Sequence, residues 1–416
     1  MGLSEQSQRR TVSVGDFIIG DIERDAVLEV LNSNRISEHV KTFEFERKFA
    51  KYIGTKTGVA VNSGTSALVL ASLTLQYSGR YPKAVRGKKV IVPALGYVAT
   101  SNAQVLTGFE PIFVDVDPVD LVCTPGHIEA AIQEHGADNI AGIVPVHLMG
   151  YPADMDAINE IARQCSLFVV EDAAQAHGTK YHGHVVGSLS DMSVYSFYIA
   201  HNIQAGEMGA LMTNDDGFAR LARQLKANGR MCDCNVCTRR QGVCPHRDPD
   251  PNSDNDPRFM HSYISFNFKT MDLQTALALT QLARADEIFD TRLKNVSYLN
   301  NGLSFLEPVI RLPRFSAEVS YLAYPLVVKD TSIVSRKTVR DHLEKNGIES
   351  RPLFGSVPTQ QPAYAAYRDR YKGKVPDSDY IGENGFYIGC HQYLKQDDLD
   401  HVVDVFRKLS NNGRWQ

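Results

Sequence analysis

The sequence lacks several features that would place the protein in a membrane or a secretory pathway. No stretch approaches the ~18 apolar residues of a membrane-spanning helix. The N-terminal segment MGLSEQSQRRTVSVGDF has no apolar core of the kind found in signal peptides. Internal repeats and low-complexity tracts are also missing. We therefore expect a cytoplasmic protein that does not contact a membrane.

Charge of one sign is equally scarce. The 44 Lys and Arg residues against 48 Asp and Glu residues give a net charge of −4, and no basic stripe interrupts the sequence. This balance argues against nucleic acid as a partner, and any anionic ligand must be held by local donors. The hydrophobic fraction of 43% is typical of a globular protein, and the 416 residues indicate roughly two to three domains.

Cysteine is sparse but unevenly placed. Seven cysteines in a cytosolic chain do not indicate a disulfide framework. Three of them, Cys123, Cys165 and Cys390, are expected to be ordinary buried thiols. The other four lie in one short polar segment, where a loop can supply every ligand of a zinc ion or an iron–sulfur centre: Cys232, Cys234, Cys237 and Cys244.

The first two thirds of the chain alternate between helical and strand patterns. FEFERKFAKYIG has helical spacing and ends at Gly54, GVAV is a short buried strand, and SGTSALVLASLTL is helical again. Similar units follow as far as GALMTND. The pattern predicts an α/β fold with a mostly parallel sheet covered by helices on both faces. Ligands of such sheets bind at the carboxyl ends of the strands.

The pattern breaks in residues 230–262, which we interpret as a Cys-rich loop insertion. A long helical run is expected from Met271, followed by strand-like YLAYPLVV and helix-like SRKTVRDHLEKNG. We predict a large cofactor-binding domain over residues 14–260 and a smaller C-terminal α+β domain over residues 263–416.

Three short motifs could carry chemistry. In SGTSAL, free backbone N–H groups before a helix favour a phosphate, although small residues also simply form turns and caps. In EDAAQAHG, Asp172 could pair with the protonated ring nitrogen of a pyridoxal cofactor, or merely cap the following turn. In SVYSFYIAHN, Ser196 and His201 lie close together in a turn, where the histidine alone would be read as structural.

The order of these motifs, together with PALGYVATSNA, FNFKTMDLQTALALTQL and GFYIGCH, resembles the DegT/DnrJ/EryC1/StrS family of sugar aminotransferases and dehydratases from Asp16 to Leu409. The resemblance implies a fold-type I pyridoxal phosphate (PLP) aminotransferase fold and a homodimer. It also implies a set of cofactor contacts: Gly64, Thr65 and Ser196 on the phosphate, Tyr97 stacked on the ring, Asp172 on the ring nitrogen, Gln175 near the ring hydroxyl, and Asn267 on the phosphate of the neighbouring subunit.

Position 201 departs from the aminotransferase pattern. Aminotransferases of the family carry a lysine there, because an amine is needed to form a Schiff base with the cofactor. Imidazole cannot form that bond, but it can act as a base near neutral pH. IAHN resembles the 3-dehydratase branch, which uses pyridoxamine phosphate (PMP) as a dissociable coenzyme. This implies dehydration at C3 of an NDP-4-keto-6-deoxyhexose, with His201 as the catalytic base.

Two other functions remain open, a PLP-dependent nucleotide-sugar aminotransferase and a non-catalytic metal-binding paralogue. The Cys loop also resembles that of iron–sulfur dehydratases, which implies a [2Fe–2S] cluster supplied with electrons by a flavin/iron–sulfur reductase. Those relatives take one ligand from the segment matching EDAAQ, where this chain has Ala173 and Ala174. A structural zinc ion is the alternative.

Overall fold

The computed structural model describes residues 11–234, 237–238, 241–242, 244–246, 250, 252–411 and 415. Its largest element is a seven-stranded sheet in the order β1-β9-β8-β5-β4-β2-β3, in which β9 alone runs antiparallel to its neighbours. The predicted mostly parallel sheet is confirmed. Its strands are β1 (Thr57–Val61), β2 (Lys89–Pro93), β3 (Glu110–Val114), β4 (Ile140–Ile143), β5 (Phe168–Asp172), β8 (Met192–Ser196) and β9 (Gly209–Thr213).

Both faces of the sheet are covered by helices because successive strand residues alternate between two apolar cores. Val90 and Phe113 pack with one set of helices, and Ile91 and Ile112 pack with another. The first set is α3 (Gly64–Ser78), α4 (Ala99–Thr107) and α7 (Asp216–Leu225), and the second includes α5 (Pro125–His135) and α6 (Met155–Cys165).

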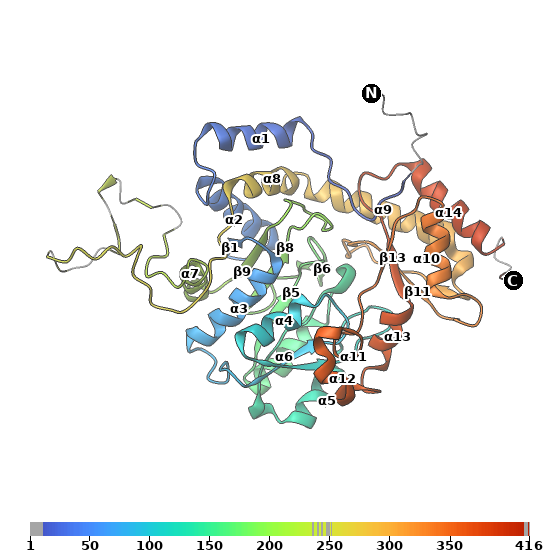
Figure 1. Ribbon diagram of the computed structural model, residues 1–416, viewed down its shortest axis with the longest axis horizontal. Helices are drawn as coiled ribbons and strands as arrows, with labels where there is room; N and C mark the ends of the chain where they lie inside the picture. Colours follow the sequence, from blue (N-terminus) through green and yellow to red (C-terminus); the bar gives the residue numbers. More distant parts are fainter. Residues whose placement is uncertain are drawn as a thin grey trace.

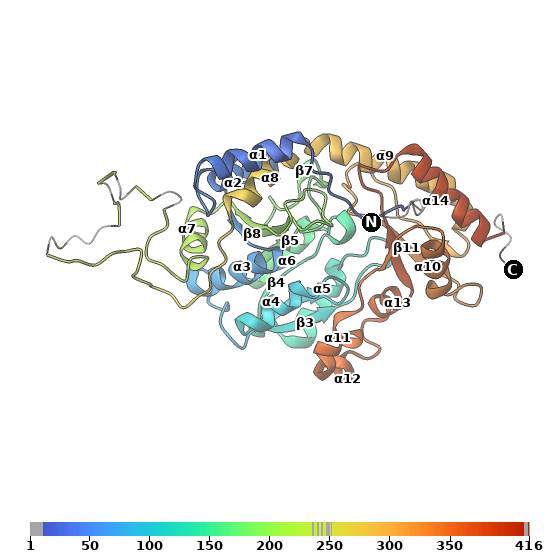
Figure 2. The same cartoon turned by 45° about the horizontal axis from the view of Figure 1, so that its top comes forward.

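Helices α1 (Asp21–Asn32), α2 (Val40–Ile53) and α8 (Asp272–Leu282) lie together beside the β1 end of the sheet (Figures 1 and 2). Helix α2 ends at Gly54, as predicted, because φ there is 90°, a left-handed value that suits glycine. The carboxylate of Asp272 accepts the N–H groups of His39 and Thr42 at 2.7 and 3.0 Å and so caps α2.

The long helical run expected from Met271 is two helices in the structure. Helix α8 stops at Leu282, and α9 (Ala285–Leu303) begins after a turn at residues 283–284. The periodicity of the sequence continues across this turn, so it gave no sign of the break. The consequence is that α8 packs on α1 and α2, whereas α9 crosses toward the C-terminal part of the chain (Figure 1).

The C-terminal part forms a second, smaller sheet in the order β10-β11-β13-β12, with all pairs antiparallel, as expected for an α+β unit. The division of the chain at residues 260–263 stays a prediction. The elements of this part are β10 (Ile310–Arg311), β11 (Tyr324–Val328), α10 (Arg336–Lys345), β12 (Ser350–Pro352), α11 (Val357–Gln360), α12 (Arg368–Tyr371), α13 (Pro376–Asn384), β13 (Gly385–Ile388) and α14 (Gln396–Leu409).

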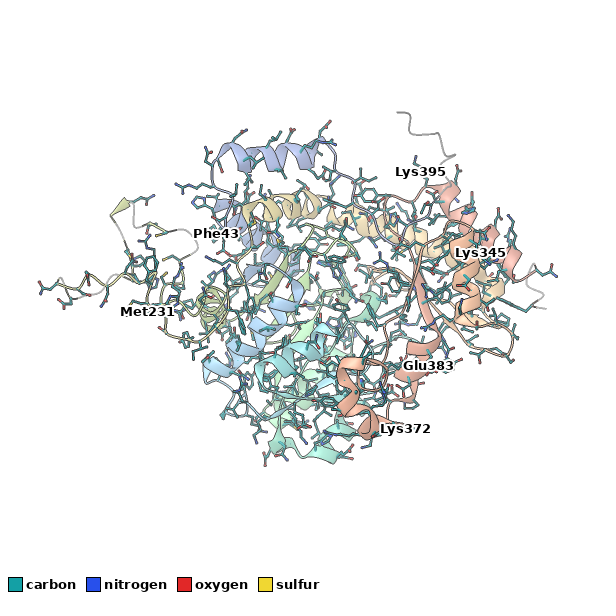
Figure 3. The ribbon with its side chains drawn as sticks, viewed as in Figure 1. Phe43, Met231, Lys345, Lys372, Glu383 and Lys395 are labelled. Carbon is teal, nitrogen blue, oxygen red and sulfur yellow. The ribbon has the colours of Figure 1, made fainter. Side chains whose placement is uncertain are left out.

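A projecting segment leaves the body of the molecule after α7 (Figures 1 and 2). Its stem is built from residues 226–231 and 260–268, which are joined by bridges between Ala227 and Asn267 and between Arg230 and His261. Met231, labelled in Figure 3, donates its N–H to the Met260 carbonyl at 2.9 Å, where the stem ends. A two-stranded hairpin of β6 (Lys180–Tyr181) and β7 (His184–Val185) lies elsewhere. Among the described helices none has both the length and the apolarity to cross a membrane.

Candidate active site

The predicted motifs meet at one edge of the large sheet. Strands β1, β2, β5 and β8 all point the same way, so their carboxyl ends lie on the same side, together with the first residue of the antiparallel β9. Gly64 follows β1, Tyr97 follows β2, Asp172 ends β5 and Ser196 ends β8. Such an edge is where ligands bind in sheets of this type.

The turn between β1 and α3 has the properties of a phosphate site. Ser63 caps the helix, because its Oγ accepts the Ser66 N–H at 3.1 Å. A Cβ atom on Gly64 would lie 2.7 Å from the Cβ of Ser196, so the backbone here approaches the end of β8 closely. Thr65 is exposed in the first turn of α3. Gly64, Thr65 and Ser196 are thus brought together at a helix N-terminus, where the dipole and free N–H groups favour an anion.

Asp172 is a buried carboxylate that has only neutral hydrogen-bond donors. Its side chain accepts the Thr100 hydroxyl at 2.7 Å and the Ala174 N–H at 3.2 Å, and in the described part of the chain it forms no ion pair. Burial raises the pKa of Asp172, and these hydrogen bonds oppose the rise only partly. A cationic ring nitrogen would supply the missing partner, so this residue fits a pyridoxal-type cofactor.

Tyr97 and Gln175 are the other two residues predicted to contact the cofactor ring. Tyr97 is 59% exposed, and its ring lies 6.0 Å from that of Phe354 between centroids, at an interplanar angle of 63°. Its carbonyl accepts the N–H of Thr100, the residue that binds Asp172. Gln175 is buried, and its Oε1 accepts the Met149 N–H at 3.0 Å. The exposed ring of Tyr97 is therefore available for stacking, whereas the carbonyl oxygen of Gln175 is already hydrogen-bonded.

His201 lies in the turn after β8. Its backbone N–H donates to the Tyr198 carbonyl at 2.9 Å. The ring atom Nδ1 is buried and has no hydrogen-bond partner in the described chain. Burial, aided by the guanidinium of Arg292, lowers the pKa of His201 to about 4. The ring is therefore neutral near pH ~7, as a base must be before it accepts a proton.

Two further residues beside His201 were not predicted. His177 lies 6.1 Å from it between ring centroids, is completely buried, and has no hydrogen-bond partner on either ring nitrogen within the described residues. Arg292 of α9 is 1% exposed and donates to the carbonyl of Leu322 at 2.7 Å. EDAAQAHG contains His177 and could have signalled it. Arg292 is distant in sequence and carries no motif.

The three lysines nearest in sequence to position 201 lie on other elements than the turn after β8. Lys226 is 3% exposed; its Nζ donates to the Ala60 carbonyl at 3.0 Å and forms an ion pair with Glu38 at 3.0 Å. Lys180 and Lys269 are exposed. The amine of Lys226 is thus already bound to a carboxylate and a carbonyl.

Asn267 lies on the stem of the projecting segment and is exposed. Its Oδ1 accepts the N–H of Lys269 at 3.2 Å. The stem is joined to the turn between β1 and α3, here called the phosphate turn, by a hydrogen bond from the Asn62 N–H to the Phe268 carbonyl at 2.9 Å. The side chain of Asn267 thus faces outward near this turn rather than lying inside the site of its own chain.

The four cysteines predicted to bind metal line a single cavity in the projecting segment, beyond the end of α7. Cys123 and Cys390 are buried, as expected, whereas Cys165 is only partly buried. The four loop cysteines lie on the projecting segment, whereas the thiol of Cys390 lies beside Arg292 and therefore near the candidate active site.

The fold and this edge together define a fold-type I PLP-dependent architecture. The chain belongs to the DegT/DnrJ/EryC1/StrS aminotransferase family, which it matches over residues 18–407. These findings confirm the family and the fold expected from the sequence, and they support a PLP or PMP cofactor.

Two curated relatives have nearly equal identity but different names. A dTDP-4-dehydro-2,6-dideoxy-D-glucose 3-dehydratase from Saccharopolyspora spinosa is 32% identical over 400 residues, covering 93% of this chain and 84% of that protein. A GDP-perosamine synthase from Caulobacter vibrioides is 33% identical over 385 residues, covering 92% and 93%. An aminotransferase structure from Psychrobacter cryohalolentis superposes with a TM-score of 0.82 at 26% identity, covering 95% and 98%.

Proposed function

We propose that this protein removes water at C3 of a nucleotide-linked 4-keto-6-deoxyhexose, with PMP as its coenzyme and His201 as the base. The observation that carries the proposal is a neutral imidazole with an unpartnered, buried Nδ1 in the turn after β8, where a Schiff-base lysine would lie in an aminotransferase. The 3-dehydratase from Saccharopolyspora spinosa supports the same reaction class.

Each residue of the edge has a separate task in this proposal. Bound PMP supplies an amine that condenses with a ketone and a ring that withdraws electrons. Gly64, Thr65 and Ser196 bind its phosphate through N–H and hydroxyl donors. Asp172 keeps the ring nitrogen protonated, and Nδ1 of His201 accepts the proton whose removal allows the C3 hydroxyl to leave.

The proposal includes a homodimer. Asn267 faces outward on a segment that also exposes Ile264 by 90% and Phe266 by 50%, an unusual amount of apolar surface for a stem so close to the phosphate turn. A second copy of the chain packed here would cover these side chains. It would also bring Asn267 to the phosphate of the neighbouring subunit.

The decisive experiment follows the C3 oxygen. Full-length protein is incubated with PMP and a panel of dTDP-, GDP-, CDP- and UDP-linked 4-keto-6-deoxyhexoses that carry ¹⁸O at C3. We expect loss of the label as water without transfer of the amine to the sugar. The His201→Asn variant should lose turnover and still bind PMP within about 3-fold of the parent, because the phosphate and ring contacts are unchanged.

The competing aminotransferase reaction gives opposite results. It requires a covalent bond between PLP and a lysine, which borohydride would reduce to a permanent attachment. Recovery of such a lysine adduct, or net amine transfer to the sugar, would contradict the dehydratase proposal. A protein that bound neither coenzyme nor sugar would instead be a non-catalytic paralogue.

A further inference from the structure

The imidazole of His201 is not oriented by a hydrogen bond at Nδ1, which has no partner in the described chain. A general base is normally oriented by a further group that binds its second nitrogen. The position of this ring must therefore come from the turn that carries it, residues 197–205. One part of the turn is held by Asn202, whose Nδ2 donates to the Ser320 carbonyl at 2.6 Å.

A second part of the turn lies against a segment close to the N-terminus. This segment, residues 12–15, is here called the N-terminal strap, and it passes beside β13 before the chain reaches α1 (Figures 1 and 2). A Cβ atom on Gly15 would lie 3.7 Å from Cα of Ala200 and 3.9 Å from the carbonyl oxygen of Ile199. The strap therefore backs the two residues that precede His201.

The strap is itself held by the C-terminal part of the chain. Val12 forms a parallel bridge with Ile348, in which its N–H donates to the Gly347 carbonyl at 2.8 Å and its carbonyl accepts the Glu349 N–H at 2.9 Å. The N–H of Val14 donates to Oε2 of Glu349 at 2.9 Å. Both valines are buried. Hydrogen bonds and apolar burial together give this part of the chain one conformation.

His391 bonds to the middle of the strap. Its Nε2 lies 3.1 Å from both the carbonyl oxygen and the hydroxyl of Ser13. Burial, aided by Arg292, lowers the pKa of His391 to about 4, so the ring is neutral near pH ~7 and carries one proton. Because Nδ1 accepts the Tyr393 N–H at 3.3 Å, that proton is on Nε2 and is donated to Ser13.

Close packing leaves the strap and His391 little freedom to separate. A Cβ atom on Gly389 would lie 2.1 Å from the carbonyl oxygen of Ser13, so the absence of a side chain there lets the strap reach His391. Nδ2 of Asn295 donates to the carbonyl of His391 at 3.0 Å and fixes it to α9. A continuous set of contacts thus runs from α9 through His391 and the strap to the turn of His201.

We propose that His391 is a positioning residue: through the N-terminal strap it holds the turn that carries His201, so that the imidazole stays where it can accept a proton. This inference rests on the proposed function, because it takes His201 to be the base. A base displaced by about 1 Å can lose about 100-fold in rate. Since His391 acts on the turn, its loss should slow turnover without weakening the binding of coenzyme or sugar.

Steady-state kinetics of full-length variants test this role. His391→Leu removes the donor to Ser13, and kcat should fall by about 10- to 100-fold, while the KM of the sugar and the affinity for PMP stay within about 3-fold. His391→Gln keeps an N–H donor near the position of Nε2 and should retain kcat within about 3-fold. A higher KM with unchanged kcat, or a Gln variant as slow as the Leu variant, would overturn the proposal.

A second substitution reaches the strap from the opposite side. Gly389→Ala places a methyl group against the Ser13 carbonyl and should lower kcat as His391→Leu does, and it tests the same contact if His391→Leu fails to fold. Because both changes act through the strap, the double variant should be about as slow as the slower single variant. Fully additive losses in this double-mutant cycle would overturn the shared route.

Hydrogen exchange in the coenzyme-free protein tests the strap without any assay of activity. The amides of residues 197–205 should exchange at least about 10-fold faster in His391→Leu than in the parent, because the turn loses its support. Unchanged exchange would overturn the proposal. A parent protein without dehydratase activity would contradict the proposed function, and yet this turn would still exchange faster in His391→Leu.

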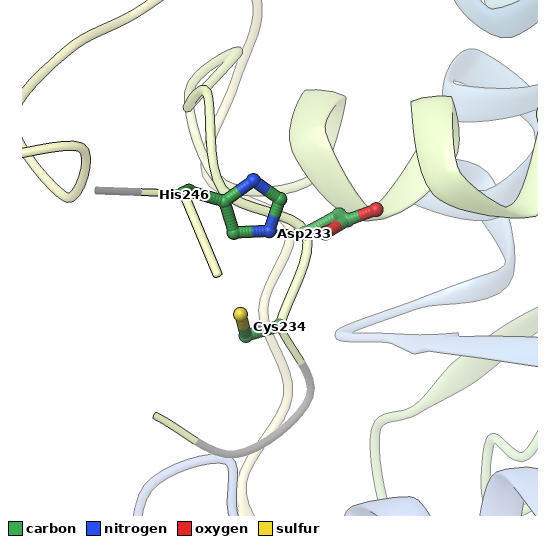
Figure 4. A group of neighbouring side chains, drawn as sticks. All are labelled: Asp233, Cys234 and His246. Atoms are coloured by element: carbon green, nitrogen blue, oxygen red, sulfur yellow. Dashed lines mark ion pairs between the residues drawn. The ribbon is translucent and has the colours of Figure 1, made fainter. Parts of the chain in front are cut away.

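Two other histidines serve as controls because they bond away from the strap. Nε2 of His401 donates to the Asn346 carbonyl at 2.8 Å in the same C-terminal part of the chain. His246 lies on the projecting segment with Asp233 and Cys234, and its Nε2 is 2.7 Å from Oδ1 of Asp233 (Figure 4). Neither His401→Leu nor His246→Leu should change the exchange of residues 197–205. Faster exchange in either control, equal to that in His391→Leu, would overturn the specific role of His391.

Discussion

Glu171 and Asp172, adjacent at the end of β5, are both buried carboxylates, but they differ in what they bind. Glu171 accepts hydrogen bonds from the N–H groups of Gly187 and Leu189 at 2.6 and 3.0 Å, and His147 and Ser190 lie at 3.1 and 2.9 Å. Asp172 has two neutral donors and no cation among the described residues. One carboxylate is therefore part of the scaffold, and its neighbour is available to a ligand.

This contrast predicts opposite effects for two matched substitutions. Asp172→Asn should weaken PMP binding by about 10- to 100-fold, since a charged hydrogen bond contributes about 1.5–3 kcal/mol. It should also stabilise the coenzyme-free protein, because burial raises the pKa of Asp172 and makes its ionised form costly. Ionisation of Asp172 lowers stability as pH rises above ~3.9, so the stabilisation should be larger near pH ~7 than near pH ~4.

Glu171→Gln is the control for Asp172→Asn. An amide cannot accept all of the hydrogen bonds made by Glu171, so we expect a loss of about 1–3 kcal/mol in the free energy of unfolding. PMP affinity should stay within about 3-fold. Urea titrations and coenzyme titrations of both variants check the pair. Weaker PMP binding in Glu171→Gln than in Asp172→Asn would refute the assignment of Asp172 to the ring nitrogen.

Gly64 and Ser196 should show coupled effects on stability. Gly64→Ala places a methyl group against the Cβ of Ser196, and we expect overpacking to cost about 1–3 kcal/mol. Ser196→Gly in the same background removes the clashing atoms and should restore most of that stability. It should not restore PMP binding, because the hydroxyl is lost as well. A double-mutant cycle of unfolding free energies with no coupling would contradict the close contact.

The lowered pKa of His201 predicts how the stability of the folded protein depends on pH. Its pKa of about 4 in the folded protein lies below the ~6.5 of an unfolded histidine, so the unfolded chain binds a proton first as pH falls. Stability should therefore decrease between pH ~6.5 and ~4, with about 2 kcal/mol of the loss between pH ~7 and ~5 due to this residue. His201→Asn should show a correspondingly shallower slope in urea unfolding. An equal slope in both proteins would mean that His201 titrates normally.

His177 should be replaceable by an apolar ring. Its imidazole contacts Tyr195 and Phe197 at centroid distances of 5.2 and 5.1 Å, and neither nitrogen has a hydrogen-bond partner in the described chain. His177→Phe removes two unsatisfied polar atoms, and we expect stability to rise by up to about 1 kcal/mol, seen as a higher melting temperature. A marked drop would show that a buried partner, such as an ordered water, binds this ring.

The sequence was sufficient to predict the layers of the fold and the strands that end at the site. Strand and helix periods differ, and Gly54 marks the end of α2, so β1, α2 and α3 could be read directly. Convergence of Gly64, Asp172 and Ser196 followed from the parallel arrangement.

Other features depend on tertiary contacts that leave no local signal. The break between α8 and α9 has no Pro or Gly to mark it, and Arg292 enters the site region from a helix that follows the loop. The grouping of Asp233 and His246 with Cys234 also could not be foreseen, since the cysteines alone carried the metal signal.

The antiparallel direction of β9 gives the two ends of this strand different tolerances to insertion. Its first residue, Gly209, is so close to the carbonyl of Ser63 that a Cβ there would lie 2.2 Å from the oxygen, so the turn before it must deliver the chain to one position. An extra residue between His201 and Gly209 that shifted β9 by one register would exchange the side chains that face the two cores, with Leu211 on one side and Ala210 and Met212 on the other. One added after Thr213 would enter the connection to α7, on the opposite side of the sheet, where a longer loop is readily accommodated.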